Sequence, residues 1–123
     1  MTTATKSFVA RHRFARMTAR KGRFVIDMIR GMNVNDAMHL LENSPRRAAV
    51  MIRKVLQSAI ANASQDPAVQ LNRLEVSECM VDDGPLLQGR MRWRPGPQGR
   101  AFPIRKRTCH ILIRVGEEDR AKA

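Results

Sequence analysis

Aromatic residues and cysteines are scarce in this sequence. Its 123 residues include no tyrosine, one tryptophan and two cysteines, Cys79 and Cys109. The cysteines form no CxxC pair, and none of the three histidines lies at ligand spacing from them, so we expect no metal site. Such sparse cysteine use favours a reducing compartment over a disulfide scaffold, although one bridge between the two remains geometrically open.

Long apolar runs are lacking as well. No stretch approaches the roughly 18 uninterrupted apolar residues that a membrane-spanning helix needs. The N-terminal segment MTTATKSFVARHRF has no apolar core of the kind that a secretion signal carries, and it is not typical of a transit peptide. We therefore expect no membrane span and residence in the cytoplasm.

The motifs of common nucleotide-binding and hydrolytic enzymes are absent. The chain contains no GxxxxGKS, GxGxxG, HExxH or GxSxG. Asp82 and Asp83 precede Gly84-Pro85, a setting more typical of a turn than of catalysis. An enzyme acting on nucleic acid would need both carboxylates and a metal, and two-metal chemistry needs more carboxylates than this sequence brings together. We expect no catalytic residue and no cofactor.

What the sequence has in excess is positive charge. Lys and Arg number 23 against 11 Asp and Glu, which gives a net charge of +12. Residues 1–30 hold eight basic and one acidic side chain, and residues 84–114 hold eight basic and none acidic. Because concentrated like charge repels itself and costs stability, two such segments indicate an anionic partner.

Nucleic acid is the polyanion that best fits this pattern. Lys and Arg gain affinity by releasing the counterions of phosphates. Arginine strongly outnumbers lysine here, and its planar guanidinium also stacks on bases, which favours a folded RNA. An acidic lipid surface would favour a basic amphipathic helix, whereas 84–114 is interrupted by Gly and Pro.

The first half of the chain predicts one strand and three helices. Residues 7–14 alternate as a strand, and Thr18 is expected to cap a helix over 19–30 that ends at Gly31. A second helix follows a cap at Asn33, and a third runs over 45–63 with Pro45 in its first turn. The apolar positions at helical spacing are Phe24, Val25, Met28 and Ile29 in the first helix; Val34, Ala37, Met38 and Leu41 in the second; and Ala48, Ala49, Ile52, Val55, Leu56, Ala59 and Ala63 in the third.

The second half predicts two strands joined by a long connection. Residues 73–81 and 104–115 are strand-like, with a bulge between Val76 and Cys79 in the first. The connection, 82–103, has 22 residues with four glycines and four prolines, and a structureless loop of that length is expected only as a functional element. Its arginines surround Trp93, so we interpret it as a cationic arm that reaches on the order of 30 Å.

These elements predict an α+β fold with three helices packed on a small antiparallel sheet of about three strands, and one long protruding β-hairpin arm. Residues 1–116 are expected to form a single RNA-binding domain that includes the arm at about 82–103. Residues 117–123 are expected to be a short charged tail.

Four motifs, in order, resemble the ribosomal protein twenty-two family of the bacterial-type large subunit. They are RMTARKGRFVIDMIRGM (16–32), SAIANA (58–63), VDDGP (81–85) and GRAFPIRKRTCHI (99–111). The resemblance implies a body seated on large-subunit ribosomal RNA beside neighbouring ribosomal proteins, an assembly role without catalysis, and a monomer within the ribosome. It also implies a hairpin that lines the exit tunnel, near the nascent peptide and the site of macrolide antibiotics.

The chain departs from the family pattern at the arm. About three extra residues lie between Gly84-Pro85 and Pro95, and Gly96 stands where the family has an arginine, so Arg94 or Arg92 is expected to take over its role.

We therefore predict a structural RNA-binding protein of the large ribosomal subunit. The alternative is an architectural DNA-binding protein that inserts the arm into a groove. The predicted RNA-binding residues are Arg11, Arg13, Arg16, Arg20, Lys21, Arg23, Arg47 and Lys54 in the body, and Arg90, Arg92, Trp93, Arg94, Arg100, Arg105, Lys106, Arg107 and His110 in the arm.

Overall fold

The computed structural model describes residues 6–117; residues 1–5, and 118–123 of the predicted tail, lie outside the described residues. The helices are α1 (Ala19–Ile29), α2 (Val34–Asn43) and α3 (Arg47–Ser64). The long strands are β1 (Ser7–Ala15), β2 (Leu74–Leu86) and β5 (Arg107–Glu117), and the short ones are β3 (Arg92–Pro95) and β4 (Ala101–Ile104). Three short 3-10 turns complete the order: η1 (Leu71–Arg73), η2 (Leu87–Gly89) and η3 (Pro97–Gly99).

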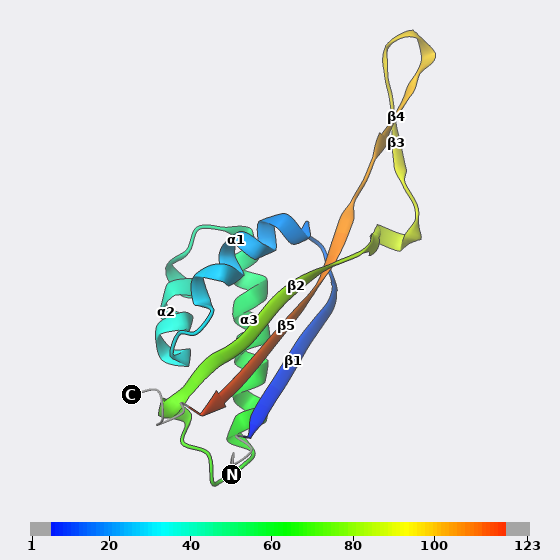
Figure 1. The fold of residues 1–123 in the computed structure, drawn as a ribbon. Coiled ribbons are helices and arrows are strands. Elements are labelled where there is room, and N and C mark those ends of the chain that lie inside the picture. The colour runs from blue at the N-terminus through cyan, green and yellow to red at the C-terminus, as the bar shows by residue number, and fades with distance from the viewer. Residues whose placement is uncertain (1–5, 118–123) are drawn as a thin grey trace.

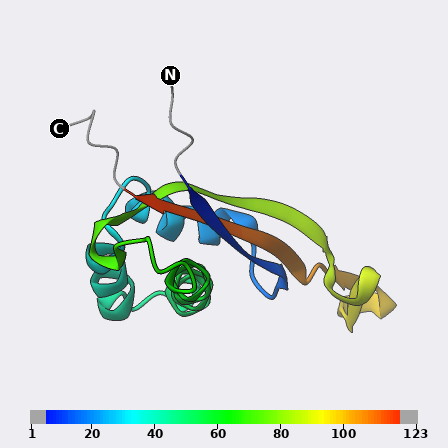
Figure 2. The same ribbon diagram turned by 90° about the horizontal axis from the view of Figure 1, so that it is seen from below.

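The body is a three-stranded antiparallel sheet with the helices on one face. The strand order is β1-β5-β2, and α3 packs on β1 and β5 while α1 packs on β2 (Figure 1). α2 packs against α3, and no helix of residues 6–117 covers the opposite face of the sheet (Figure 2). The predicted α+β fold, with three helices and a protruding hairpin formed by β3 and β4, is confirmed.

α3 follows its predicted apolar stripe at every position. All seven residues of the stripe, from Ala48 to Ala63, are buried. Its start differs from the prediction, since the helix begins at Arg47 and not at Pro45. Ser44 and Arg46 are extended, and the Ser44 hydroxyl accepts a hydrogen bond from the Arg46 N–H (3.4 Å), a local turn that competes with helix formation.

The predicted apolar positions of α1 are half wrong. Val25 and Ile29 are buried, but Phe24 is 54% and Met28 47% exposed. The buried face instead includes Gly22, where a Cβ would lie 3.0 Å from Met17 Cε and 3.2 Å from Val81 Cγ1. The buried face of α1 therefore consists of Ala19, Gly22, Val25, Ile26 and Ile29, and Phe24 and Met28 lie outside it.

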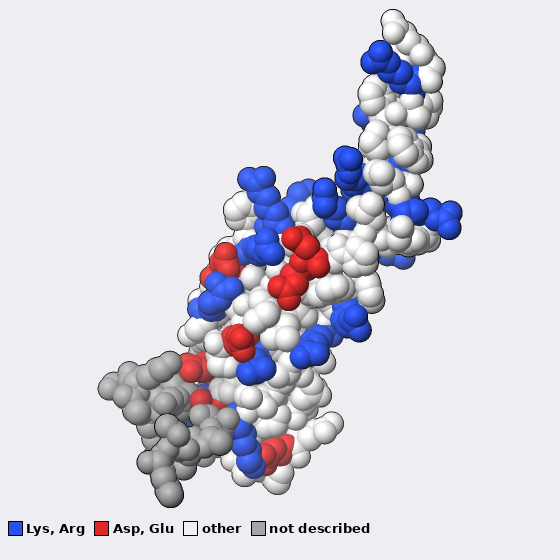
Figure 3. Space-filling view, turned by 45° about the vertical axis from the view of Figure 1, so that its right-hand side comes forward, with Lys and Arg blue, Asp and Glu red and all other residues white. Residues whose placement is uncertain are grey.

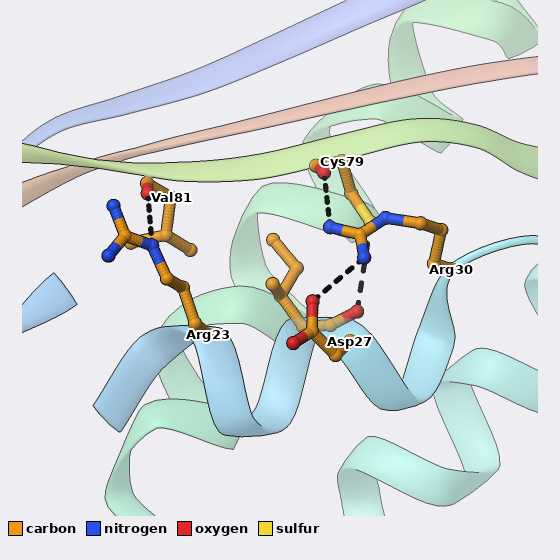
Figure 4. A network of polar contacts seen from close by, with 6 residues as sticks. Arg23, Asp27, Arg30, Cys79 and Val81 are labelled. Carbon is orange, nitrogen blue, oxygen red and sulfur yellow. Dashed lines mark hydrogen bonds and ion pairs between the residues drawn. The ribbon is translucent and has the colours of Figure 1, made fainter. Parts of the chain in front are cut away.

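One arginine in α1 and one at its C-cap donate hydrogen bonds to backbone carbonyls on the outer edge of β2, as Figure 4 shows. Arg23 Nε donates to the Val81 carbonyl (3.1 Å) and Arg30 Nη2 to the Cys79 carbonyl (3.0 Å). Asp27 fixes Arg30 through a 2.8 Å ion pair. An unpaired strand edge is a template for aggregation, so these side chains protect it.

Details of the strands match the sequence pattern. The register of β2 shifts between Val76 and Glu78, where the bulge was predicted. Ile111, Ile113 and Val115 of β5 are all buried, as their alternation indicates. Gly31 has a φ of +78°, the left-handed conformation expected after α1.

The first residues assigned to the arm belong to the central sheet. Asp82 pairs with His110 and Leu86 with Arg107, so β2 continues past the predicted end of its strand at 81. The segment that leaves the body runs over 87–106, and within it β3 and β4 pair only with each other (Figure 1).

Candidate nucleic-acid interface

A pocket of about 780 Å³ lies where the arm joins the body. We call it the junction pocket. It is lined by the β1–α1 connection and α1 (Arg16, Met17, Thr18, Lys21, Phe24), by the start of α3 (Arg46, Arg47, Ala48), and by the base of the arm (Leu87, Arg105, Lys106, Arg107).

The lining of the junction pocket combines positive charge with apolar surface. Seven of its side chains are Lys or Arg and none is acidic. Met17, Phe24, Ala48 and Leu87 supply apolar surface, with the Arg46 guanidinium 5.9 Å from the centroid of the Phe24 ring. Such a lining can hold phosphate groups and also contact the flat surface of a base.

Two helices begin at the junction pocket without any acidic residue in their first turn. Thr18 caps α1 by accepting from the Lys21 N–H (3.4 Å), whereas Arg46, the N-cap residue of α3, makes no side-chain capping hydrogen bond. The first N–H groups of a helix lack intrahelical partners and carry partial positive charge. Basic side chains at such ends are electrostatically unfavourable unless an anion lies close by, which supports phosphate binding here.

Hydrogen bonds join the two limbs of the chain at the base of the arm. The Leu87 N–H donates to the Lys106 carbonyl (2.7 Å), and the Thr108 hydroxyl donates to the Pro85 carbonyl. Gly84 permits this close packing, because a Cβ there would lie 2.6 Å from Thr108 Oγ1. These contacts hold the two limbs together where they join the central sheet, beside the basic residues at the starts of α1 and α3.

Six predicted RNA-binding residues meet in the junction pocket. They come from three separate parts of the chain: Arg16 and Lys21, Arg47, and Arg105, Lys106 and Arg107. Figure 3 shows basic side chains gathered where the arm leaves the body and along the arm, and acidic side chains on the body alone.

The other predicted residues lie elsewhere. Arg11 and Arg13 lie on the helix-free face of the sheet, because they alternate along β1 with the side that buries Ala10. Arg20 is exposed on α1 and Lys54 on α3. Arg23 is hydrogen-bonded to β2. His110, assigned to the arm by sequence, lies in β5 within the body sheet, because β2 and β5 pair through residues 82–86. Arg90, Arg92, Trp93, Arg94 and Arg100 are exposed on the arm.

Sequence reasoning missed Arg46 and Phe24. Phe24 was assigned to the core by its spacing, but the buried face of α1 contains Gly22, Val25 and Ile29, and Phe24 lies outside it. Arg46 was detectable: it precedes a helix whose first turn contains no carboxylate, and a basic side chain at that end of a helix conflicts with the helix dipole.

The hairpin of the arm has two chemically different faces. Residues directly opposite in an antiparallel pair lie on the same face. Arg92 pairs with Ile104 and Arg94 with Phe102, which forms a cationic face. Trp93, 61% exposed, pairs with Pro103, and Pro95 pairs with Ala101, which forms an apolar face without charge.

Steric crowding by Phe102 explains why a glycine, Gly96, stands at the arm tip. A Cβ on Gly96 would overlap Cε2 of Phe102, so the ring occupies the space of a side chain at this position. An arginine, which the family pattern has here, does not fit unless Phe102 moves. Arg94, beside Phe102 on the cationic face, is one of the two arginines expected to replace it.

Among residues 6–117, no group of three or more His, Cys, Asp or Glu side chains could hold a metal ion. Asp82 and Asp83 are exposed on β2. None of the helices in this part of the chain is long and apolar enough to cross a membrane.

Both cysteines are free and buried. Burial raises the pKa of the Cys79 thiol and of the Cys109 thiol above the ordinary value of 9.0. The neutral thiol is therefore the stable form at physiological pH, and neither cysteine has the properties of a reactive group.

Comparison with known proteins covers nearly all of this structure. The family model described as ribosomal protein L22p/L17e matches residues 10–116. The large ribosomal subunit protein uL22 of Clostridium acetobutylicum is 47% identical over 107 residues, which cover 87% of this chain and 94% of that protein. The matched range includes both sides of the junction pocket and the whole arm.

Proposed function

Because the chain belongs to the L22p/L17e family of ribosomal proteins, we propose that the junction pocket and the cationic face of the arm are the surfaces through which it binds large-subunit ribosomal RNA. Members of this family are structural constituents of the large ribosomal subunit, and so is this chain, with ribosomal RNA and other ribosomal proteins as partners. In bacteria that subunit is cytoplasmic. The family is structural, and we propose that this chain has no catalytic role.

One observation carries the proposal: seven Lys and Arg side chains from three segments converge in the junction pocket with no acidic residue among them. A folded domain that lacked an anionic partner would gain stability by placing a carboxylate in such a cluster. The arm adds further cations on one face and extends away from the body. It therefore reaches beyond the RNA surface that the body is proposed to bind.

Salt dependence of binding tests this proposal. If about eight phosphates are neutralised, log affinity for a large-subunit RNA transcript should fall with log salt at a slope of about −6 to −7. The double variant R47Q/K106Q should reduce the steepness by about 1.4 to 1.8, since each lost contact contributes about 0.7 to 0.9. The control K6Q/R73Q removes the same charge outside the pocket and should leave the slope nearly unchanged. A flat response of the unaltered protein would refute the proposal.

Competition separates this function from the DNA-bending alternative, which the family assignment does not support. Structured large-subunit RNA should displace the protein from duplex DNA at equal nucleotide concentration. Duplex DNA that competes equally well would favour the alternative.

We also propose that the arm lines the nascent-peptide exit tunnel, with its cationic face on the RNA wall and its apolar face toward the lumen. The resemblance noted above supports the location, and the register of β3 and β4 supports the division of faces. A photo-crosslinker at Trp93 should then capture a stalled nascent chain, and one at Arg92 should capture RNA. The reverse pattern would contradict the assignment.

Macrolide antibiotics are proposed to bind near the same face. Substituting Trp93 by Ala in assembled ribosomes should change the footprint of a bound macrolide, while substituting Arg20, exposed on α1, should not. A footprint that is unaffected by the Trp93 change would refute this contact.

A further inference from the structure

Phe14 is an exposed aromatic residue in a strained conformation outside the junction pocket. It lies in the irregularity of β1 between His12 and Ala15, with a φ of +59°. A bulky residue in the left-handed region is a genuine outlier. Phe14 is nevertheless 51% exposed, so the body gains little buried area from this arrangement.

Specific contacts hold the Phe14 ring in place. Its backbone N–H donates to Nδ1 of His110 (3.1 Å), and the two rings meet edge to face, with centroids 5.0 Å apart and planes at 86°. Gly84 leaves room for the imidazole of His110, since a Cβ there would lie 3.2 Å from its Cε1 and Nε2. The ring is therefore presented in one orientation.

The surroundings of Phe14 are cationic and polar. The Arg13 guanidinium lies 5.2 Å from the ring centroid, and Arg11, His12 and Arg16 are exposed nearby in the chain. Asp82 on β2, which pairs with His110 on β5, is an acidic neighbour of this site. A protein-docking surface would continue the apolar patch around the ring, whereas these neighbours are polar. Aromatic rings accompanied by arginines are typical of sites that stack single-stranded bases.

We propose that Phe14 is a stacking platform for an unpaired base of the ribosomal RNA, with Arg11 and Arg13 on the flanking phosphates. The inference rests on the proposed function and names a second RNA contact, on the helix-free side of the body. It explains why the backbone is strained at this position: the strain displays a ring that binding then covers.

The test compares Phe14→Leu with Phe14→Trp in binding of the full-length protein to a large-subunit RNA transcript. Leu keeps an apolar side chain but has no flat face, and it should weaken binding about five- to a hundredfold, the range of one stacked base. Trp should keep affinity within about threefold. Leu71→Ala, an exposed apolar residue in η1, is the control and should have no effect.

The salt slope distinguishes stacking from charge. Phe14→Leu should leave the slope unchanged, because a stacked base releases no counterion, whereas Arg13→Gln should reduce its steepness by about 0.7 to 0.9. Thermal unfolding of both Phe14 variants verifies that they fold.

Two results would overturn the platform while the proposed function stands: equal affinity of Phe14→Leu and the unaltered protein, or a reduced slope for Phe14→Leu. A flat salt response of the unaltered protein would instead remove the proposed function itself.

Discussion

At the scale of single residues, close approach decides which side chains face water. A Cβ at Gly22 would lie 3.0 Å from Cε of Met17 and 3.2 Å from Cγ1 of Val81, so this side of α1 faces β2, and Phe24 on another side lines the junction pocket. Gly84 and Gly96 likewise leave room for Thr108 and Phe102. These glycines are needed for space, since a φ in the left-handed region is found at Gly31, Gly89 and Gly99 and not at them.

Gly84→Ala is expected to destabilise the protein by about 1 to 3 kcal/mol, the usual cost of overpacking. The new methyl group would displace Thr108, which bonds Pro85, and press on His110. Urea unfolding measures the change. Gly89→Asn is the matched control, because Gly89 has open space around it and Asn tolerates its φ of +72°. Equal stability of the Gly84 variant and the unaltered protein would contradict the packing.

The two thiols should be unreactive in the folded protein. Burial raises the pKa of both, so the thiolate that reacts with a disulfide reagent is scarce at pH 8 and poorly accessible. Reaction with Ellman's reagent should be slow under native conditions and should reach two thiols per chain after denaturation in urea. Rapid native reaction of either cysteine would show that its site opens.

At the scale of elements, the contrast is between α3 and the arm. α3 buries a complete apolar stripe against β1 and β5, whereas β3 and β4 bury none of their residues and pair only with each other. Local stability follows buried contacts, so the two elements are expected to open with very different free energies.

Amide hydrogen exchange on the free protein tests this contrast. Residues 45–63 should be strongly protected and residues 86–100 should exchange rapidly, since the hairpin is exposed on both faces. Binding to large-subunit RNA should then protect the arm. Strong protection of the arm in the free protein would show that it does not depend on a partner for its order.

At the scale of the whole molecule, function and stability make opposite demands on charge. The net charge of +12 is concentrated in two segments, and the fold brings both to the junction pocket. Mutual repulsion there opposes folding until an anion is bound.

The free protein should accordingly become more stable as salt rises, because screening weakens this repulsion. Its melting temperature should increase between low and moderate ionic strength. R47Q/K106Q should melt higher than the unaltered protein at low salt and respond less to added salt, with K6Q/R73Q as the control. A melting temperature that falls with salt in the unaltered protein would contradict the charge argument.

The sequence by itself determined the elements whose signal is local. The stripe of α3, the alternation of β5, the bulge near Val76 and the acid-free basic segments are all periodicities or compositions of neighbouring residues, and the family motifs extend over nearly the whole chain. Only the tertiary structure decided which of the basic residues act together. Arg16, Arg47 and Lys106 meet because strand register and helix packing join segments far apart in sequence. Long-range contacts also decided which face of α1 is buried, bonded Arg23 to the edge of β2 and placed Phe14 against His110, and no pattern of neighbouring residues encodes contacts of that kind.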